Sequence, residues 1–402
     1  MINYEDIDKI LSFFPISQAL IFFALFVSLY YVNKQKHFLY ISLYKLFIIV
    51  FFAMSFMFYY KVQNIVALTF NFSIPIILLF LPIFYLYVDC LTTPNKSLKP
   101  KIWFHFFPSI FTVLVLSPYM FMPFEEKILF VSGGFGKYDS NWIVNYITFI
   151  YRFGVFFIIN AQILVYVFLF RRLFKRHKRN IEQLFSYKEN IDLRWLSNLM
   201  LIFLLSFIVL NFTRFLDVRH DVTTRIIFNI CFGVVNLYIG IRAVIQPNIF
   251  SLIRDNDSIA KQMVDDEITI NIKSDTKIDS LKEKYSGSSL TEETKEIIVN
   301  QINEYMTTKP YRNSKLTVED VADALNTNTR YLSQIINEKY QVNFFNFINN
   351  YRILEAVELL KSPDADKYTI EGIAQMVGFN SKSSFNTSFK KNTGLTPSEI
   401  RK

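Results

Sequence analysis

The chain has 402 residues, of which 52% are hydrophobic and 17% aromatic, and phenylalanine alone occurs 44 times. This apolar and aromatic content exceeds what one soluble core of this length needs, so the composition argues against an ordinary globular protein. The formal net charge of +9 is not by itself a sign of nucleic-acid binding, because the basic residues gather in loops between apolar runs.

Nearly all of the apolar excess lies before about residue 247, in runs long enough to cross a membrane. A hydrocarbon layer of about 30 Å takes about 20 apolar residues in a helix. We predict a seven-helix transmembrane domain at residues 1–247, with spans at residues 13–32, 38–60, 64–90, 102–122, 141–170, 195–216 and 224–245. Pro75, Pro82, Pro108 and Pro118 interrupt the third and fourth runs, where they can kink a helix or mark half-helices.

Basic residues follow the first, third and fifth runs and predict the orientation, because cytoplasmic loops collect Lys and Arg. The three loops contain Lys34 and Lys36; Lys96, Lys99 and Lys101; and Arg171, Arg172, Lys175, Arg176, Lys178, Arg179, Lys188 and Arg194. We therefore expect a multi-pass protein of the inner, cytoplasmic membrane, with the N-terminus outside and the C-terminus in the cytoplasm. The run from Arg171 to Arg179 can also bind anionic lipid or DNA.

A few polar residues fall inside the predicted spans. Lys45 lies about two turns into the second run and Asp89 near the inner end of the third, so these two can pair. We favour the alternative that Lys45 extends to the cytoplasmic surface. Hydrogen bonds between helices are expected from Asn71, Asn160, Asn211 and Asn236.

After Gln246 the chain turns polar, and residues 248–290 are predicted to be a cytoplasmic linker that acts as hinge, tether or lever. Helical periodicity returns at Thr291. A first helix, which ends at Lys309-Pro310, is expected to carry on one face Ile297, Ile298, Ile302, Tyr305 and Met306.

Two similar patterns follow, at residues 317–339 and 369–393. Each has a threonine N-cap, a buried stripe, a residue suited to positive φ at the turn, and a second helix. In the first pattern the N-cap is Thr317, the buried stripe is Val321, Ala322 and Leu325, and the turn residue is Asn326. In the second pattern the N-cap is Thr369, the buried stripe is Ile373, Ala374 and Val377, and the turn residue is Gly378. Leu332 and Ile336 are expected to face inward in the first copy, and Phe385 and Phe389 in the second. The repeat predicts two helix-turn-helix units.

Residues 344–361 form one amphipathic helix between the two units. It spans about 27 Å at about 1.5 Å per residue, which suits a spacer that sets two reading heads about one DNA turn, roughly 34 Å, apart. Its apolar face is expected to contain Phe344, Phe347, Ile348, Tyr351, Ile353, Leu354, Val357 and Leu360. The chain closes with Thr396-Pro-Ser-Glu, which has the spacing of a capping box.

Residues 291–402 resemble the DNA-binding domain of the AraC/XylS family of transcriptional regulators. The family spacing is carried by Ile373-Ala374, Gly378-Phe379, Phe385, Phe389-Lys390-Lys391, Gly394, Thr396-Pro397 and Arg401. The stretches that begin at Leu332 and Asn343 look like a branch of that family fused to seven-span membrane domains, typically in Bacteroidota. The fold class is then all-α: a transmembrane bundle followed by a cytoplasmic helical DNA-binding domain.

The resemblance implies two recognition helices that enter successive major grooves of double-stranded promoter DNA. The implied base-reading positions are Thr329, Arg330, Ser333, Gln334 and Asn337 in the first helix, and Lys382, Ser383, Asn386 and Thr387 in the second. Arg330 suits guanine, whereas Gln334, Asn337 and Asn386 suit adenine. Lys390 and Lys391 are expected to contact phosphate. Because Thr387 stands where the family often has arginine, the second helix is expected to read bases weakly.

The predicted function is that of a membrane-bound one-component transcriptional regulator, in which a membrane sensor domain receives an unknown signal and controls the DNA-binding tail. A homodimer formed through the membrane domain is compatible with this function. The alternative is a transporter or lipid-binding membrane protein whose tail is a regulatory interaction module. The sequence has no metal cluster and no nucleophile–base pattern, so we expect no enzyme activity, cofactor or metal site.

Overall fold

The computed structural model describes residues 4–93, 100–133, 142–189, 191–202, 205, 222–247 and 291–401. Over these residues the regular secondary structure is helical, and an isolated antiparallel bridge joins Phe185 to Thr317. The all-α part of the fold prediction is thereby confirmed for the described residues. The chain divides into two compact units: Met1–Leu173 with Trp195–Gln246, and Phe174–Arg194 with Pro247–Lys402.

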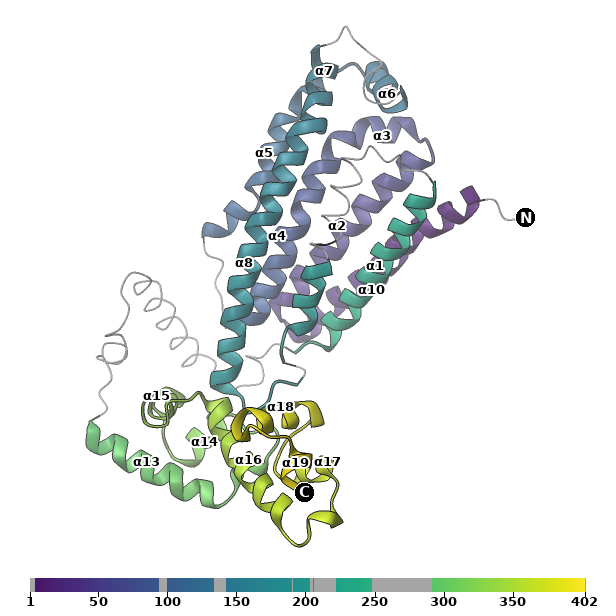
Figure 1. The fold of residues 1–402 in the computed structure, drawn as a ribbon. Coiled ribbons are helices and arrows are strands. Elements are labelled where there is room, and N and C mark those ends of the chain that lie inside the picture. Colours follow the sequence, from purple (N-terminus) through teal and green to yellow (C-terminus); the bar gives the residue numbers. More distant parts are fainter. Residues whose placement is uncertain are drawn as a thin grey trace. The chain divides into compact units, whose positions relative to one another are not determined.

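The first unit is built from long apolar helices (Figure 1). They are α1 (Tyr4–Asn33), α2 (Lys36–Tyr59), α4 (Ser73–Thr92), α8 (Val155–Leu184) and α10 (Val222–Ile245). Helix α1 packs along α2 and α10, and α2 packs along α4. Shorter helices complete the unit: α3 (Gln63–Thr69), α5 (Phe107–Val115), α6 (Phe124–Gly133) and α7 (Trp142–Phe149).

Among the described residues, five helices are long and apolar enough to cross a membrane: Ile10–Asn33, Lys36–Phe58, Gln63–Thr92, Val155–Leu184 and Ile226–Ile245. They correspond to the first, second, third, fifth and seventh predicted runs. The fourth run does not form one long helix, because Pro108 opens α5 and Pro118 opens the short 3-10 helix Ser117–Phe121. The sixth run lies mostly outside the described residues, so the number of seven spans stays a prediction.

The lysine in the second run is buried inside the first unit. Lys45 donates a hydrogen bond of 2.9 Å to the carbonyl oxygen of Asn236 in α10 and another to its side-chain oxygen. The ammonium also lies 5.0 Å from the centre of the Phe22 ring. The favoured interpretation that Lys45 extends to the surface is therefore wrong. The main-chain and side-chain oxygens of Asn236 supply acceptors for the lysine within the helical bundle.

The predicted intramembrane asparagines behave differently from one another. Asn236 does bond between helices, as predicted, by accepting from Lys45. Asn160 instead donates to the carbonyl oxygen of Phe156 in its own helix, at 2.7 Å. The prediction of a bond between helices is wrong for this residue, which bonds to the residue four positions earlier. Asn71 is buried, and its side-chain atoms have no hydrogen-bond partner among the described residues. Asn211 lies outside the described residues.

The second unit contains the tail helices. They are α13 (Glu292–Thr307), α14 (Val318–Ala324), α15 (Thr329–Lys339), α16 (Phe344–Lys361), α17 (Ile370–Met376), α18 (Lys382–Thr393) and α19 (Pro397–Arg401). Polar side chains cap their starts, which fixes the helix boundaries that the sequence predicts. The N-caps of α13 to α18 are Thr291, Thr317, Asn328, Asn343, Thr369 and Ser381.

The turns of the two helix-turn-helix units use the residues expected at those places. Asn326 has φ of 49° and Gly378 has φ of 101°. The closing helix also has its predicted cap, since the main-chain nitrogen and hydroxyl of Thr396 donate to Glu399 at 2.6 and 2.7 Å. Local sequence signals thus define both units and the end of the chain.

Two apolar clusters form the core of the second unit, and α16 contributes to both. The first cluster takes Phe344, Phe347 and Ile348 from α16, and the second takes Ile353, Ala356 and Leu360. Leu354 was predicted to be on this face but is 64% exposed. The inward row instead runs through Ile348, Arg352, Ala356 and Leu360, four residues apart, so a buried arginine occupies a core position.

Candidate nucleic-acid interface

Helix α18 has one face in the core and one face in solvent. Phe385, Ser388 and Phe389 are buried. The predicted DNA-contacting residues of this helix are exposed: Lys382, Ser383, Asn386, Thr387, Lys390 and Lys391. The outward orientation predicted for the second recognition helix is therefore what the structure has.

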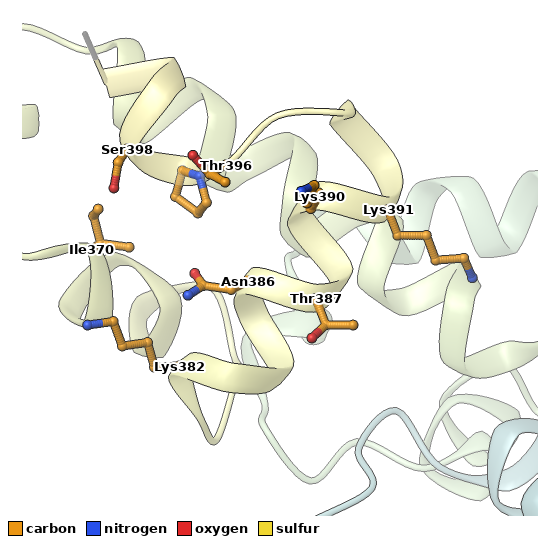
Figure 2. Close-up of a pocket in the computed structure, with 9 residues that line it drawn as sticks. Ile370, Lys382, Asn386, Thr387, Lys390, Lys391, Thr396 and Ser398 are labelled. Atoms are coloured by element: carbon orange, nitrogen blue, oxygen red, sulfur yellow. The ribbon is translucent and has the colours of Figure 1, made fainter.

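The exposed face of α18 borders a hollow of about 670 Å³ (Figure 2). Its lining consists of Ile370, Lys382, Asn386, Thr387, Lys390, Lys391, Thr396, Pro397 and Ser398. Figure 2 shows Ile370 and Asn386 facing one another across the hollow, with Thr396 and Ser398 on the third side. Three of the nine residues are lysines and none is acidic, so the surface suits a polyanion.

The lysines of this face differ in their surroundings. Lys391 Nζ donates to Asn346 Oδ1 of α16 at 3.0 Å, which turns its side chain away from the hollow. Lys382 follows the N-cap Ser381 directly, in the first turn of α18. Sequence reasoning placed Lys382 among base readers, but its position at a helix N-terminus also suits a phosphate.

Helix α15, the predicted first recognition helix, is covered on more than one side. Arg330 is exposed and Asn337 half-buried, but Thr329, Ser333 and Gln334 are 7%, 6% and 2% exposed. The predicted outward placement is wrong for these three residues: Thr329 is buried at the start of α15, and Ser333 and Gln334 belong to five successive buried positions, 332 to 336. Their reading of bases stays a prediction, and it requires that α15 be uncovered.

Helix α13 is one of the elements that pack on α15. Lys295 Nζ lies 3.0 Å from Glu338 Oε2, and the hydroxyl of Tyr340, just after α15, donates to Asn303 at 2.8 Å. Gln334 donates along its own helix to Glu338 at 3.0 Å. Glu338 thus interacts with both Lys295 and Gln334, whereas Gln334 Oε1 is buried and has no hydrogen-bond partner among the described residues.

Arg352 and Glu355 are buried charged residues that the sequence analysis did not identify. The Arg352 guanidinium donates to the carbonyl oxygens of Tyr311, Ser186 and Asn313 at 2.7, 3.0 and 2.8 Å. It also lies 5.6 Å from the centre of the ring of Phe379, in the turn of the second helix-turn-helix unit. The spacing of Ile348, Arg352 and Ala356 was the available signal, because an arginine on that row must face inward.

Charge compensation is different for the two residues. Burial lowers the pKa of Arg352 to about 10, with the charge of Glu189 acting in the opposite direction, so the guanidinium stays charged at neutral pH. Burial alone would raise the pKa of Glu355, but hydrogen bonds from Arg312 and Lys309 outweigh it and lower that pKa. Both residues therefore hold the connection before α14 against α16 as ions.

The described residues contain no group of three or more His, Cys, Asp or Glu side chains that would hold a metal ion. The chemistry available at the exposed face is hydrogen bonding and charge attraction, from ammonium, amide and hydroxyl groups.

Comparisons with known proteins concern the tail. Residues 321–402 match the family model described as "Helix-turn-helix domain". The chain is 28% identical over 106 residues to the probable transcription factor PqrA of Proteus vulgaris, covering 26% of this chain and 84% of that protein. It is 34% identical over 89 residues to the uncharacterized HTH-type transcriptional regulator YijO of Escherichia coli, covering 22% and 30%.

A solved structure gives a similar match. The C-terminal domain of AraT, a response regulator from Geobacillus stearothermophilus, has 33% identity, covers 28% of this chain and 87% of that chain, and gives a TM-score of 0.24. The chain spans 11%, 31% and 30% of the length of three curated relatives that it matches, in contrast to 84% of PqrA. The tail of this chain is therefore a helix-turn-helix domain of the type found in AraC-family transcriptional regulators.

Proposed function

We propose that this protein is a membrane-bound one-component transcriptional regulator. Its apolar helices lie in the cytoplasmic membrane and sense a signal, and its tail binds double-stranded promoter DNA. The five membrane-compatible helices support the membrane location. The basic loops after the first, third and fifth runs support an outside N-terminus and a cytoplasmic tail.

The observation that carries DNA binding is the exposed, acid-free face of α18 within a domain that matches a helix-turn-helix family. Lys382 and Lys390 are placed to neutralise phosphates, and Asn386 lies between them on the same face with an amide suited to adenine. Binding through this face positions the tail on the duplex. Uncovering α15 would add the second reading head, with Arg330 as its exposed cation.

The covered state of α15 gives the proposed regulator a state in which one predicted recognition helix is closed to DNA. A regulator needs two states of its DNA-binding surface that differ in affinity for DNA. One state has α18 open and α15 covered; the other has both helices open. The signal would shift the balance between them, and homodimer formation through the membrane helices would bring two tails to one promoter.

The test is to map the DNA sites of the tagged full-length chain in cells, by cross-linking, immunoprecipitation and sequencing. We expect a limited set of promoter sites that share a sequence motif. Asn386→Ala should alter the motif, and Lys390→Ala should weaken occupancy at every site alike. Uniform recovery of all DNA, or none, would contradict the regulator function.

Topology has its own test. Reporter fusions within residues 123–140 and at the C-terminus should report opposite sides of the membrane, with the C-terminus in the cytoplasm. A C-terminus on the outer side would exclude DNA as the partner of the tail.

A further inference from the structure

The segment Phe174–Arg194, which we call the docking segment, belongs to the same compact unit as the tail. Helix α8 runs through Leu173 and Phe174 without a break and ends at Leu184. Directly after it, Phe185 pairs with Thr317 in the isolated antiparallel bridge. The main-chain nitrogen and hydroxyl of Ser186 both donate to the carbonyl oxygen of Leu316, at 3.1 and 2.7 Å. The chain just before α14 is thus bonded to residues that lie far earlier in the sequence.

Apolar side chains of the docking segment complete the first core cluster. Ile181, Leu184, Phe185 and Ile191 are 2%, 3%, 0% and 2% exposed, in one cluster with residues of α13, α14, α15 and α16. These values match those of the tail's own core residues. The docking segment is therefore packed as an internal element of the domain, since loosely attached surface loops keep exposed backbone and side chains.

The docking segment also supplies partners for the buried cation. Arg352 makes five hydrogen bonds, and two of them end on Ser186, at its carbonyl oxygen and its hydroxyl, both at 3.0 Å. Glu189 is the charge that opposes the effect of burial on this guanidinium. A buried charge that loses its acceptors is strongly unfavourable, so Arg352 makes the tail dependent on the docking segment.

Two carboxylates of the docking segment bind residues that cap tail helices. Glu182 Oε2 accepts from Asn343 Nδ2, the N-cap of α16, at 3.3 Å. Glu189 Oε1 accepts from Ser381 Oγ, the N-cap of α18, at 3.1 Å. Lys188, predicted only as a topology anchor, lies 2.7 Å from Glu182 and 4.2 Å from the centre of the Phe345 ring. The docking segment therefore touches the first helix-turn-helix unit, the spacer helix and the second recognition helix.

We propose that the docking segment is a permanent part of the DNA-binding domain and that α8, continuous with it, is the route through which the membrane helices control DNA binding. The second half of this inference rests on the proposed function. The docking segment contacts both helix-turn-helix units, so a rotation or shift of α8 would act on both of them.

Docking itself is tested by cross-linking in the full-length chain in membranes, with Cys90 and Cys231 replaced by alanine. Glu189→Cys with Ser381→Cys should be joined by a short bifunctional thiol reagent, because the native side chains are in contact. The control pair is Glu189→Cys with Asn392→Cys, an exposed residue about 16 Å further along α18. We expect at least a tenfold higher yield for the first pair. Equal yields, or no product with Ser381→Cys, would overturn the docking.

Control through α8 is tested by inserting one alanine between Leu173 and Phe174. One added residue turns the helix on one side by about 100° relative to the other, because a turn takes about 3.6 residues. The matched control is one alanine between Ser288 and Ser289, in the predicted linker. Affinity for a mapped promoter fragment is measured by fluorescence anisotropy with the full chain in nanodiscs.

We expect the α8 insertion to change affinity at least tenfold and the linker insertion less than twofold. A larger effect of the linker insertion, or no effect of the α8 insertion, would overturn control through α8. If the unaltered chain binds no DNA, the proposed function fails and α8 control falls with it, while the cross-linking result still decides the docking.

Discussion

The guanidinium of Arg352 binds both the carbonyl and the hydroxyl oxygen of Ser186, a residue 166 positions earlier in the chain. Arg352→Lys keeps the charge but cannot reach Ser186, Tyr311 and Asn313 together, because an ammonium lacks the planar fork. We expect a loss of about 2–4 kcal/mol in the local stability of the tail. Ser186→Ala removes only the hydroxyl and should cost about 1 kcal/mol.

Hydrogen exchange of α16 peptides in the full-length protein measures both changes. Equal protection in Arg352→Lys and the unaltered chain would show that the guanidinium bonds do not stabilise the domain.

The backbone conformation and the neighbouring atoms both favour glycine at position 378. Its φ is 101°, and a Cβ atom there would lie 2.5 Å from the carbonyl oxygen of Tyr311 and 2.9 Å from that of Arg312. Gly378→Ala should therefore destabilise the second helix-turn-helix unit by more than about 2 kcal/mol. Gly394→Ala is the matched control, since φ is 77° but nothing lies within 4 Å of the added atom. It should cost about 1 kcal/mol, from backbone strain alone.

The readout for both glycine variants is hydrogen exchange of α17 and α18. A cost for Gly394→Ala as large as that for Gly378→Ala would mean that the contact with the Tyr311 and Arg312 carbonyls is unimportant.

Lys390 offers a test of the polyanion-binding face. If it contacts one phosphate, Lys390→Ala should reduce the slope of log affinity against log salt concentration by about 1, for every DNA sequence alike. Lys367→Ala is the control, because that exposed lysine is on a different element and pairs with Asp364 at 2.5 Å. The measurement is a salt titration of DNA binding. An unchanged slope with Lys390→Ala would place the DNA elsewhere.

The Lys45–Asn236 pair predicts an asymmetry between two substitutions. Asn236→Ala leaves a buried cation with fewer acceptors, whereas Lys45→Met removes the charge and keeps an apolar side chain of similar length. The detergent-solubilised protein should have a lower Tm with Asn236→Ala than with Lys45→Met. Adding Lys45→Met to Asn236→Ala should recover part of the loss. Asn160→Ala, which loses a bond within one helix, should have little effect.

Local signals predicted the tail well. The spacer helix has the predicted bounds, Phe344–Lys361, and both units begin at the predicted threonine caps. These features depend on neighbours within a few residues: a cap side chain, a turn residue with positive φ, and a stripe at helical spacing. Sequence reasoning therefore recovers helix starts, turns and the exposed face of α18.

Features that depend on distant partners escaped prediction. Leu354 is exposed although it was expected on the apolar face, and the buried Arg352 was not identified; the inward side of α16 packs into two clusters, one of which includes Phe185. The burial of Gln334 could not be predicted either, since a polar residue on an outer helical position gives no sign of being covered. The basic residues of Phe174–Arg194 predict topology and binding of anionic lipid or DNA, but they give no sign that the apolar residues between them pack in the core of the tail.

The bridge between Phe185 and Thr317 also sets an order of events during synthesis. Ile181, Leu184 and Phe185 leave the ribosome well before their core partners exist, and they stay without a partner from the tail until residues beyond 291 have been made. Contacts of such long sequence separation form slowly. A chain that terminates early would thus present these apolar side chains to chaperones and proteases, which gives the cell a way to recognise an unfinished copy.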